Sequence, residues 1–266
     1  MCRKRAPYEN GRNGIHVRLT GREKRMISMN YSHIKAGTFQ SRPNRFIALV
    51  EVEGTVEICH VKNTGRCKEL LIPGVTVYLE ESENSGRKTK YDLIAVKKGE
   101  RLINIDSQAP NRATAEWLAG GGLIPADEIT LLRPECRYGN SRFDFYLETK
   151  NRKLFLEVKG VTLEENGAVF FPDAPTERGV KHLTELSACV EAGYEAAVLF
   201  LIQMKDVSGF SPNDRTHPAF GEALRNARDH GVMILAYDCS VTPDSMELCS
   251  RVPILLENFQ GSTASE

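Results

Sequence analysis

The 266-residue sequence lacks several features that would place it in a familiar class. No stretch approaches the roughly 18 apolar residues of a membrane-spanning helix, and the first residues have no apolar core of a signal peptide. The seven cysteines are scattered, odd in number and never spaced as CxxC. These absences predict a soluble cytoplasmic protein with free cysteines, without structural zinc and without a membrane partner.

Three common catalytic motifs are also missing. The run Gly120-Gly121-Gly122 is not followed by Lys-Ser or Lys-Thr, so it cannot be a Walker loop, and no strand leads into a GxGxxG dinucleotide motif. The GxSxG turn of serine hydrolases does not occur. The sequence therefore gives no support to P-loop, dinucleotide-dependent or serine-hydrolase chemistry.

Net charge is absent as well, because 35 Lys and Arg residues balance 35 Asp and Glu residues. No overall positive field is available to attract nucleic acid, so any surface of that kind must be local. Hydrophobic residues make up 41% and charged residues 26% of the chain, which is ordinary for a globular protein with a real core. The length favours two domains.

Changes of pattern divide the chain into four parts. Residues 1–31 are rich in Lys and Arg with little apolar periodicity, which predicts a flexible basic extension, and residues 259–266 form a tail. Between residues 32 and 109, short β-forming runs occur at 46–50, 56–58, 75–79, 91–96 and 102–105. Five such strands predict a small barrel. Barrels of the OB type have about this number of strands and commonly bind oligonucleotides or oligosaccharides, which is an argument by fold analogy.

Residues 110–258 alternate helices and strands instead. The expected elements, in order, are a helix at 112–119, strands at 130–138, 142–148 and 153–159, a helix at 175–191, a strand at 196–202, a helix at 218–229 and a strand at 232–237. This order predicts a mixed sheet flanked by helices, so the fold class is α/β (α+β).

Two expected neighbouring strands of that sheet carry the candidate catalytic residues. Alternation places Asp144 with Tyr146 on the face opposite the phenylalanines of its strand, and it places Glu157 and Lys159 together on one face of the next strand. Two carboxylates suit Mg²⁺ or Mn²⁺, which polarises a phosphoryl oxygen and lowers the pKa of a bound water. Asp144 and Glu157 as metal ligands, with Lys159 neutralising developing charge, predict phosphodiester hydrolysis.

Alternatives to this interpretation remain open. Glu157 and Lys159, two apart on a strand, are also typical of an exposed salt pair. A glycosidase would likewise use two carboxylates, but it has no need for the lysine beside them.

The helix expected at 175–191 adds charged residues after a proline-rich approach, with Asp173 as its expected cap. Its Gly179 predicts a close backbone contact, because glycine costs about 1 kcal/mol relative to alanine inside a helix. The expected apolar stripe contains Val180, Leu183, Leu186 and Val190. The expected polar face contains Glu177, Arg178, Lys181, His182 and Glu185.

A basic, amide-rich loop in the first domain predicts contact with phosphates, although a solvated turn would have the same composition. Together with basic residues near it in sequence and with Arg142 of the second domain, the loop gives the candidate nucleic-acid-binding set Arg45, Lys62, Asn63, Arg66, Lys68 and Arg142.

Five separated motifs together resemble the sugar fermentation stimulation protein family, SfsA, over about residues 32–258. They are RPNRF at 42–46, HVKNTGR at 60–66, RYGNSRFD at 137–144, EVKGVT at 157–162 and FPDAPTERGVKH at 171–182. The resemblance implies an N-terminal OB-fold and a C-terminal restriction-endonuclease-like domain of the PD-(D/E)XK type. In this chain Arg142-Phe143 stands where the proline of that motif often lies.

The resemblance also implies binding of DNA or RNA and a nuclease site on Asp144, Glu157 and Lys159. The family's name offers a second hypothesis, a DNA-binding regulator of sugar metabolism genes without catalytic activity. Residues that could assist the site are Glu116, Glu135, Asp173, Glu177, Arg178, Lys181 and His182.

Overall fold

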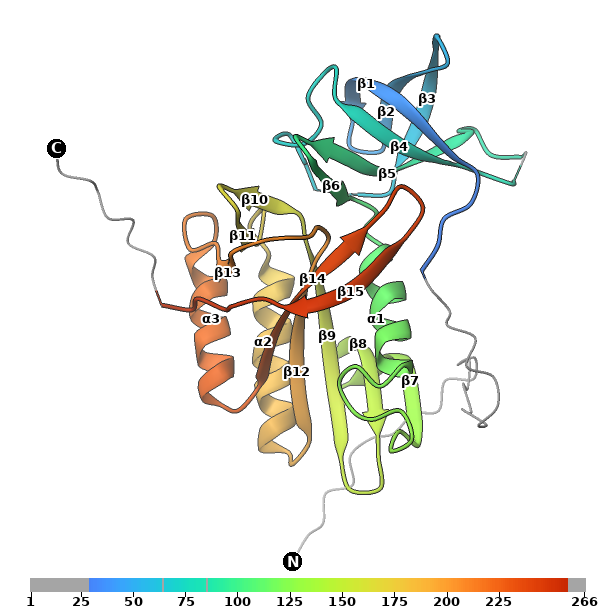
Figure 1. The fold of residues 1–266 in the computed structure, drawn as a ribbon. Helices are drawn as coiled ribbons and strands as arrows, with labels where there is room; N and C mark the ends of the chain where they lie inside the picture. The colour runs from blue at the N-terminus through green and yellow to red at the C-terminus, as the bar shows by residue number, and fades with distance from the viewer. Residues whose placement is uncertain (1–28, 64, 85, 258–266) are drawn as a thin grey trace, which may run out of the picture.

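The computed structural model describes residues 29–63, 65–84 and 86–257. The chain forms a small barrel, drawn in blue to green, stacked on one end of a larger domain of helices and strands (Figure 1). The basic extension was predicted at residues 1–31, and its first 28 residues lie outside the described residues. The tail predicted at 259–266 also lies outside them. No helix within the described ranges is both long and apolar enough to cross a membrane.

The barrel consists of five strands and carries a sixth beside them. Their order in the sheet is β3-β2-β1-β4-β5-β6, and a parallel pairing of β3 with β5 closes the first five into a barrel. The closed five-strand barrel of OB type is therefore confirmed. The strands are β1 (Ile34–Asn44), β2 (Ile47–Val52), β3 (Thr55–Val61), β4 (Thr76–Glu81), β5 (Tyr91–Lys98) and β6 (Arg101–Asn104).

Within the barrel, the strand that the sequence did not predict is β1. It is the longest of the six, yet Phe39 is its one fully buried residue. Gly37 packs so closely that a Cβ there would lie 2.6 Å from Val50 Cγ1. Glycine, serine and proline within β1 interrupt its apolar alternation, so the sequence does not predict this strand. The fifth barrel strand was instead predicted at 102–105. That segment is β6, which pairs with β5 and extends the sheet outside the barrel.

The larger domain is a six-stranded mixed sheet of order β15-β14-β12-β9-β8-β7, as the alternation of elements predicted. Its strands are β7 (Leu131–Tyr138), β8 (Ser141–Glu148), β9 (Lys153–Val161), β12 (Glu195–Ile202), β14 (Met233–Val241) and β15 (Met246–Arg251). Its helices are α1 (Ala109–Ala119), α2 (Glu177–Glu191) and α3 (Pro218–Asp229).

Both faces of the larger sheet are covered. Helix α1 packs with Leu156 and Leu199 on one face, and α2 and α3 pack with Phe155 and Phe200 on the other. The central strand β12 is almost wholly buried, which is why it reads as a continuous apolar run.

A separate three-stranded sheet lies between the barrel and helix α3, and the prediction missed it together with β15. Its strands are too short or too polar for a periodic signal: β10 (Leu163–Glu165), β11 (Ala168–Phe171) and β13 (Gly209–Pro212).

The predicted extension is too long at its C-terminal end. Met29 is fully buried in the core beneath α1, Asn30 forms a β-bridge with Ser245, and Tyr31 N donates to Asp244 O. These residues join the larger domain before the chain enters the barrel, so the segment around Tyr31 belongs to the folded structure.

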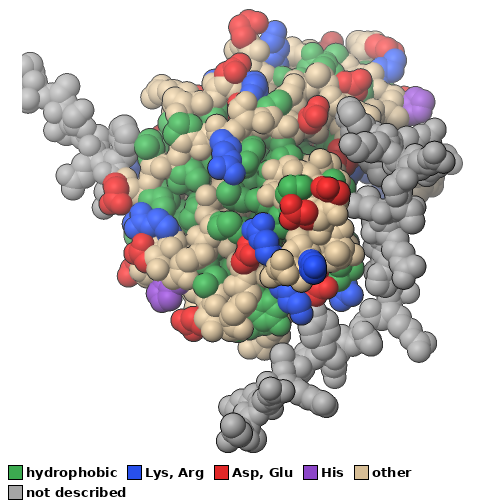
Figure 2. All heavy atoms as spheres, turned by 60° about the horizontal axis from the view of Figure 1, so that its bottom comes forward, with side chains coloured by type: hydrophobic (Ala, Val, Ile, Leu, Met, Phe, Trp, Pro, Cys, Tyr) green, Lys and Arg blue, Asp and Glu red, His purple; other side chains and the backbone are tan. Residues whose placement is uncertain are grey.

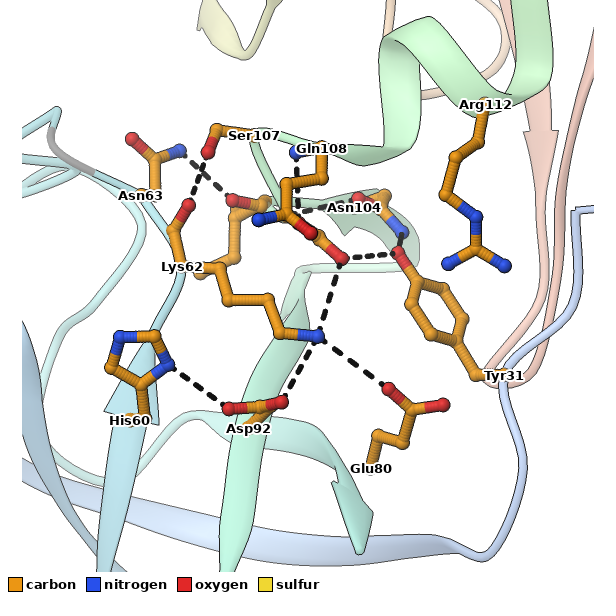
Figure 3. A network of polar contacts seen from close by, with 12 residues as sticks. Tyr31, His60, Lys62, Asn63, Glu80, Asp92, Asn104, Ser107, Gln108 and Arg112 are labelled. Carbon is orange, nitrogen blue, oxygen red and sulfur yellow. Dashed lines mark hydrogen bonds and ion pairs between the residues drawn. The ribbon is translucent and has the colours of Figure 1, made fainter. Parts of the chain in front are cut away.

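A polar network joins the two domains around Lys62 (Figure 3). Its ammonium lies 2.9 Å from Asp92, 3.6 Å from Glu80 and 3.8 Å from Asp106, and its side chain is 18% exposed. Ser107, two residues before α1, donates to the backbone carbonyl of Lys62. The network thus links strands of the barrel to the start of the larger domain.

Helix α2 begins differently from the prediction. Its cap is Thr176, whose hydroxyl accepts from Gly179 N, and not Asp173. The close contact expected at Gly179 is confirmed, because a Cβ there would lie 2.9 Å from Thr176 Cγ2 and 3.1 Å from the ring of Phe220 on α3.

Alanine at Gly179 is therefore expected to lower the free energy of unfolding by about 1–3 kcal/mol through overpacking. This loss should outweigh the gain of about 1 kcal/mol in helix propensity. Thermal and urea unfolding measure it, with Thr184→Ala on the exposed side of α2 as the control. Equal or greater stability of Gly179→Ala would contradict the close packing of α2 against α3.

Candidate active site

Asp144 lies where strands β8 and β9 part. The paired stretch runs from Glu148 to Phe145, and at the next residue the Asp144 carboxylate replaces the backbone partner by accepting from Val158 N at 2.8 Å. Its other oxygen accepts from Asn111 Nδ2 of helix α1 at 2.8 Å. One strand, its neighbour and a helix therefore fix this carboxylate.

The predicted alternation along β8 is wrong at this point. Phe143 lies in the core beneath α2, whereas Phe145 lies in the opposite core beneath α1. Tyr146, expected on a polar face with Asp144, is fully buried. Regular alternation requires a continuous ladder, and the ladder between β8 and β9 ends beside Asp144.

Glu157 and Lys159 share one face of β9, as predicted, but that face is covered by helix α2. Lys159 Nζ lies 2.6 Å from Glu157 Oε1. His182 Nδ1 contacts the same oxygen, although the sequence placed this histidine on the solvent side of the helix. The exposed salt pair considered as an alternative is thereby excluded, because both side chains are largely buried.

Burial and mutual repulsion shape the ionisation of the two carboxylates. Burial, followed by the charge of Glu157, raises the pKa of Asp144. Burial also acts to raise the pKa of Glu157, but the hydrogen bond from His182 and the charge of Lys159 outweigh it, so this pKa lies below its ordinary value. Glu157 is thus held ionised close enough to Asp144 for the two to repel.

The two carboxylates fit a hard cation on one specific observation. Glu157 Oε2 is buried and has no hydrogen-bond partner among the described residues, an arrangement that is costly unless something binds it. A cation would also relieve the repulsion from Asp144. The described residues contain no group of three His, Cys, Asp or Glu side chains able to hold a metal.

The predicted accessory residues divide into two groups. Arg178 and His182 reach the site, since Arg178 Nε lies 3.3 Å from His182 Nε2 and His182 contacts Glu157. Lys181 instead donates to Asn140 O at 3.2 Å, in the turn between β7 and β8, and none of its described contacts reaches the carboxylates of the site.

The four accessory acids have other surroundings. Glu177 pairs with His217 at 3.2 Å and is 88% exposed, and Glu135 pairs with Arg142 at 3.5 Å. Glu116 packs near Met29, and Asp173 lies against Gly65 of the barrel loop. None of these described contacts brings a third carboxylate to Asp144.

The candidate nucleic-acid-binding residues of the barrel also divide. Lys62 is held by carboxylates, and Asn63 is used to shape its own loop by donating to Ile105 O and accepting from Gly65 N. Arg45, Arg66 and Lys68 remain exposed.

Arg42 organises these exposed groups. Its guanidinium donates to the backbone carbonyls of Arg45, Asn63, Gly65 and Arg66, which brings the β1–β2 turn and the basic loop together. Beside them the ring of Phe46 is 45% exposed, with the Arg45 guanidinium 4.8 Å from its centroid.

Three features of these two sites are not predicted by the sequence pattern: the contact of Asn111 with Asp144, the burial of His182, and the exposed ring of Phe46. Asn111 and His182 lie on α1 and α2, and the rotation of each helix about its own axis is fixed only when the helix packs against the sheet. For Phe46 the sequence does hold a signal of a binding surface, because the aromatic residue stands beside Arg45. It was instead assigned to the strand predicted at 46–50.

One face of the molecule carries both signs of charge. On the face seen in Figure 2, basic and acidic side chains are interspersed and do not gather into a single basic patch. This agrees with the net charge of zero, and on this face electrostatic attraction for nucleic acid is limited to local groups.

The fold and the site define a two-domain protein in which an OB-type barrel is stacked on a restriction-endonuclease-like domain. Residues 41–105 match the SfsA N-terminal OB domain, and residues 108–245 match the sugar fermentation stimulation protein RE domain. The chain belongs to the sugar fermentation stimulation protein family, SfsA.

Relatives of this family cover most of the chain. A sugar fermentation stimulation protein homolog of Desulfitobacterium hafniense strain Y51 is 61% identical over 86% of this chain and 99% of its own. A homolog of Clostridium beijerinckii is 56% identical over 86% of this chain and 100% of its own. The structure of Pyrococcus furiosus SfsA in complex with Ca²⁺ is 28% identical, with a TM-score of 0.77 over 85% of this chain and 98% of that one.

Proposed function

We propose that this protein is a metal-dependent nuclease that hydrolyses phosphodiester bonds of DNA or RNA at Asp144, Glu157 and Lys159. The observation that carries the proposal is a pair of mutually repelling carboxylates, the partly exposed Asp144 and the buried Glu157 with its unpartnered oxygen, beside a lysine on the same strand face as Glu157. An ordinary structural salt pair would need neither the second carboxylate nor the unpartnered oxygen.

Each residue has a distinct task in this reaction. Asp144 and Glu157 would hold Mg²⁺ or Mn²⁺, which when bound polarises a phosphoryl oxygen and lowers the pKa of a water. Asn111 and the backbone N–H of Val158 keep Asp144 in place by one hydrogen bond to each of its oxygens. Lys159 carries a positive charge next to Glu157, where it can offset negative charge that develops on the phosphate.

The related structure supports the same class of cation. Pyrococcus furiosus SfsA was solved in complex with Ca²⁺, a hard cation that takes oxygen ligands as Mg²⁺ does. By this likeness we assign an oxygen-preferring divalent cation to the carboxylate pair of the present chain.

The nucleic-acid strand is proposed to contact the barrel at Arg45, Arg66 and Lys68. Arg42 ties the turn and the loop that carry them, so their charges act as one local patch. Exposed Phe46 offers a ring on which a base can stack. This patch lies on the side where Gly65 meets Asp173 of the larger domain.

Replacing Arg66 and Lys68 together with alanine is expected to weaken binding of oligonucleotides of any sequence. Each phosphate contact removed should lower the slope of log K against log salt by about 1. Fluorescence anisotropy across a range of salt concentrations, in chelator so that no cleavage occurs, measures both effects. Lys153→Ala, exposed at the far end of β9, is the control. A salt slope like that of the wild type would remove this patch from the binding surface.

The proposal is tested by incubating the full chain with labelled single-stranded and duplex DNA and RNA, in Mg²⁺, in Mn²⁺ and in chelator. We expect cleavage products only in the lanes that contain metal. The nucleic acids that yield products in those lanes identify the substrate. Absence of cleavage from every lane with metal would refute the nuclease.

A regulator that binds DNA without cutting it is the second candidate. Its supporting observation is that Lys159 and His182 both engage Glu157 Oε1 and that the described residues add no third acidic ligand. This candidate predicts nucleic-acid binding that survives chelation and no cleavage in the same assay.

A further inference from the structure

His182 fills the space between helix α2 and the sheet and faces Glu157. It is 4% exposed, and its ring stands edge-on to Phe143 with centroids 6.1 Å apart. A polar ring so deeply buried is costly unless its nitrogens find partners. Both nitrogens have one, and the identity of these partners determines what the ring can do.

Arg178, one helical turn before His182, fixes the tautomer of the ring. Its Nε lies 3.3 Å from His182 Nε2. A guanidinium only donates hydrogen bonds, so Nε2 accepts and the ring proton of the neutral imidazole lies on Nδ1. His182 therefore donates through Nδ1–H to Glu157 Oε1.

Lys159 donates to that same oxygen. Its Nζ lies 2.6 Å from Glu157 Oε1 and 3.5 Å from His182 Nδ1, and since both nitrogens are donors they converge on the carboxylate. Two hydrogen bonds fill the two lone-pair positions of Oε1. The buried oxygen Oε2 is left without a partner among the described residues.

We propose that His182 is a positioning residue that, with its tautomer set by Arg178, fixes the Glu157 carboxylate so that Oε2 alone remains available to a divalent cation. The inference rests on the proposed metal-dependent function and deepens it. His182 itself contacts neither cation nor substrate in this role. It acts through Glu157, as the outer partners of metal ligands commonly do.

The test is calorimetric titration of Mn²⁺ into the full chain without nucleic acid, so that the readout does not depend on cleavage. We expect His182→Ala to weaken Mn²⁺ binding by about 10- to 100-fold. His182→Asn should recover most of the affinity, because its amide N–H can donate from near the position of Nδ1. Arg178→Met leaves the ring but frees its tautomer, and should weaken binding by less than His182→Ala.

The control variants separate this inference from the proposed function. His230→Ala, an exposed histidine at the end of α3, should bind Mn²⁺ like the wild type. Glu157→Gln should lose binding. If Glu157→Gln loses binding while His182→Ala retains wild-type affinity, the positioning role is overturned and the metal site stands. If Glu157→Gln retains wild-type affinity, the metal site and the positioning role both fail.

A general collapse of the site would give a different pattern. Binding of a labelled oligonucleotide in chelator should stay within about twofold for His182→Ala, because no direct contact with nucleic acid is removed. If His182→Ala does not fold, Arg178→Met and His182→Asn decide. If Arg178→Met binds Mn²⁺ with wild-type affinity, control of the tautomer by Arg178 is contradicted. If a folded His182→Asn loses its affinity for Mn²⁺ as well, donation through Nδ1 is contradicted.

Discussion

Methionine at Lys159 is expected to lower the rate of phosphodiester cleavage by about 10²–10³-fold, the usual loss when one charge-stabilising group leaves an active site. The binding of Mn²⁺ should stay at least as tight as in the wild type, because an ammonium 2.6 Å from Glu157 competes with a cation for that carboxylate. Single-turnover cleavage and calorimetry on the same preparation measure the two effects.

Loss of cleavage without loss of Mn²⁺ binding would distinguish the role of Lys159 from that of the metal ligands. Glu157→Gln should lose cleavage and metal binding together, whereas Lys159→Met should lose cleavage alone. If Lys159→Met also loses Mn²⁺ binding, the lysine acts by supporting the carboxylates and not by offsetting charge on the phosphate.

Methionine at Lys62 is expected to lower the free energy of unfolding by about 3–5 kcal/mol, the range found when one partner of a buried ion pair is removed. The ammonium lies among Asp92, Glu80 and Asp106, and its loss leaves three acidic groups without their shared cation. Chemical denaturation measures the change. Lys68→Met, exposed in the same loop, is the control and should change stability by less than about 0.5 kcal/mol.

The effect of Lys62 should depend on pH. Burial acts to raise the pKa of Asp92, but hydrogen bonds from Arg87 and Lys62 outweigh it and hold the pKa well below its ordinary value. A depressed folded-state pKa gives stabilisation that is present above the unfolded value of about 3.9 and is lost as pH falls through the folded value. The gap between wild type and Lys62→Met should therefore narrow below about pH 4. A gap independent of pH would show that Lys62 stabilises by packing alone.

Much of the architecture could be predicted from periodicity. Helix α3 has the predicted bounds, and β12 was recognisable because both of its faces are buried. Strand β1 was not, because its many polar residues and its one glycine and one proline leave little apolar alternation, so the strand is defined by its neighbours.

The candidate site was predictable in composition but not in geometry. Glu157 and Lys159 alternate regularly, so their shared face followed from the sequence. The position of Asp144 did not, because it depends on where β8 and β9 stop pairing. The inward orientation of His182 and the reach of Asn111 depend on how α2 and α1 rotate against the sheet, which only the assembled core fixes.

The most direct test of the proposed nuclease compares metal-dependent cleavage by wild type and by Asp144→Asn, purified in parallel. Asparagine keeps the size of the side chain but removes its charge, so folding and oligonucleotide binding should persist. We expect cleavage by the wild type that requires Mg²⁺ or Mn²⁺ and that falls at least about 10²-fold in the variant. Equal cleavage by both proteins, or binding without cleavage by the wild type, would contradict it.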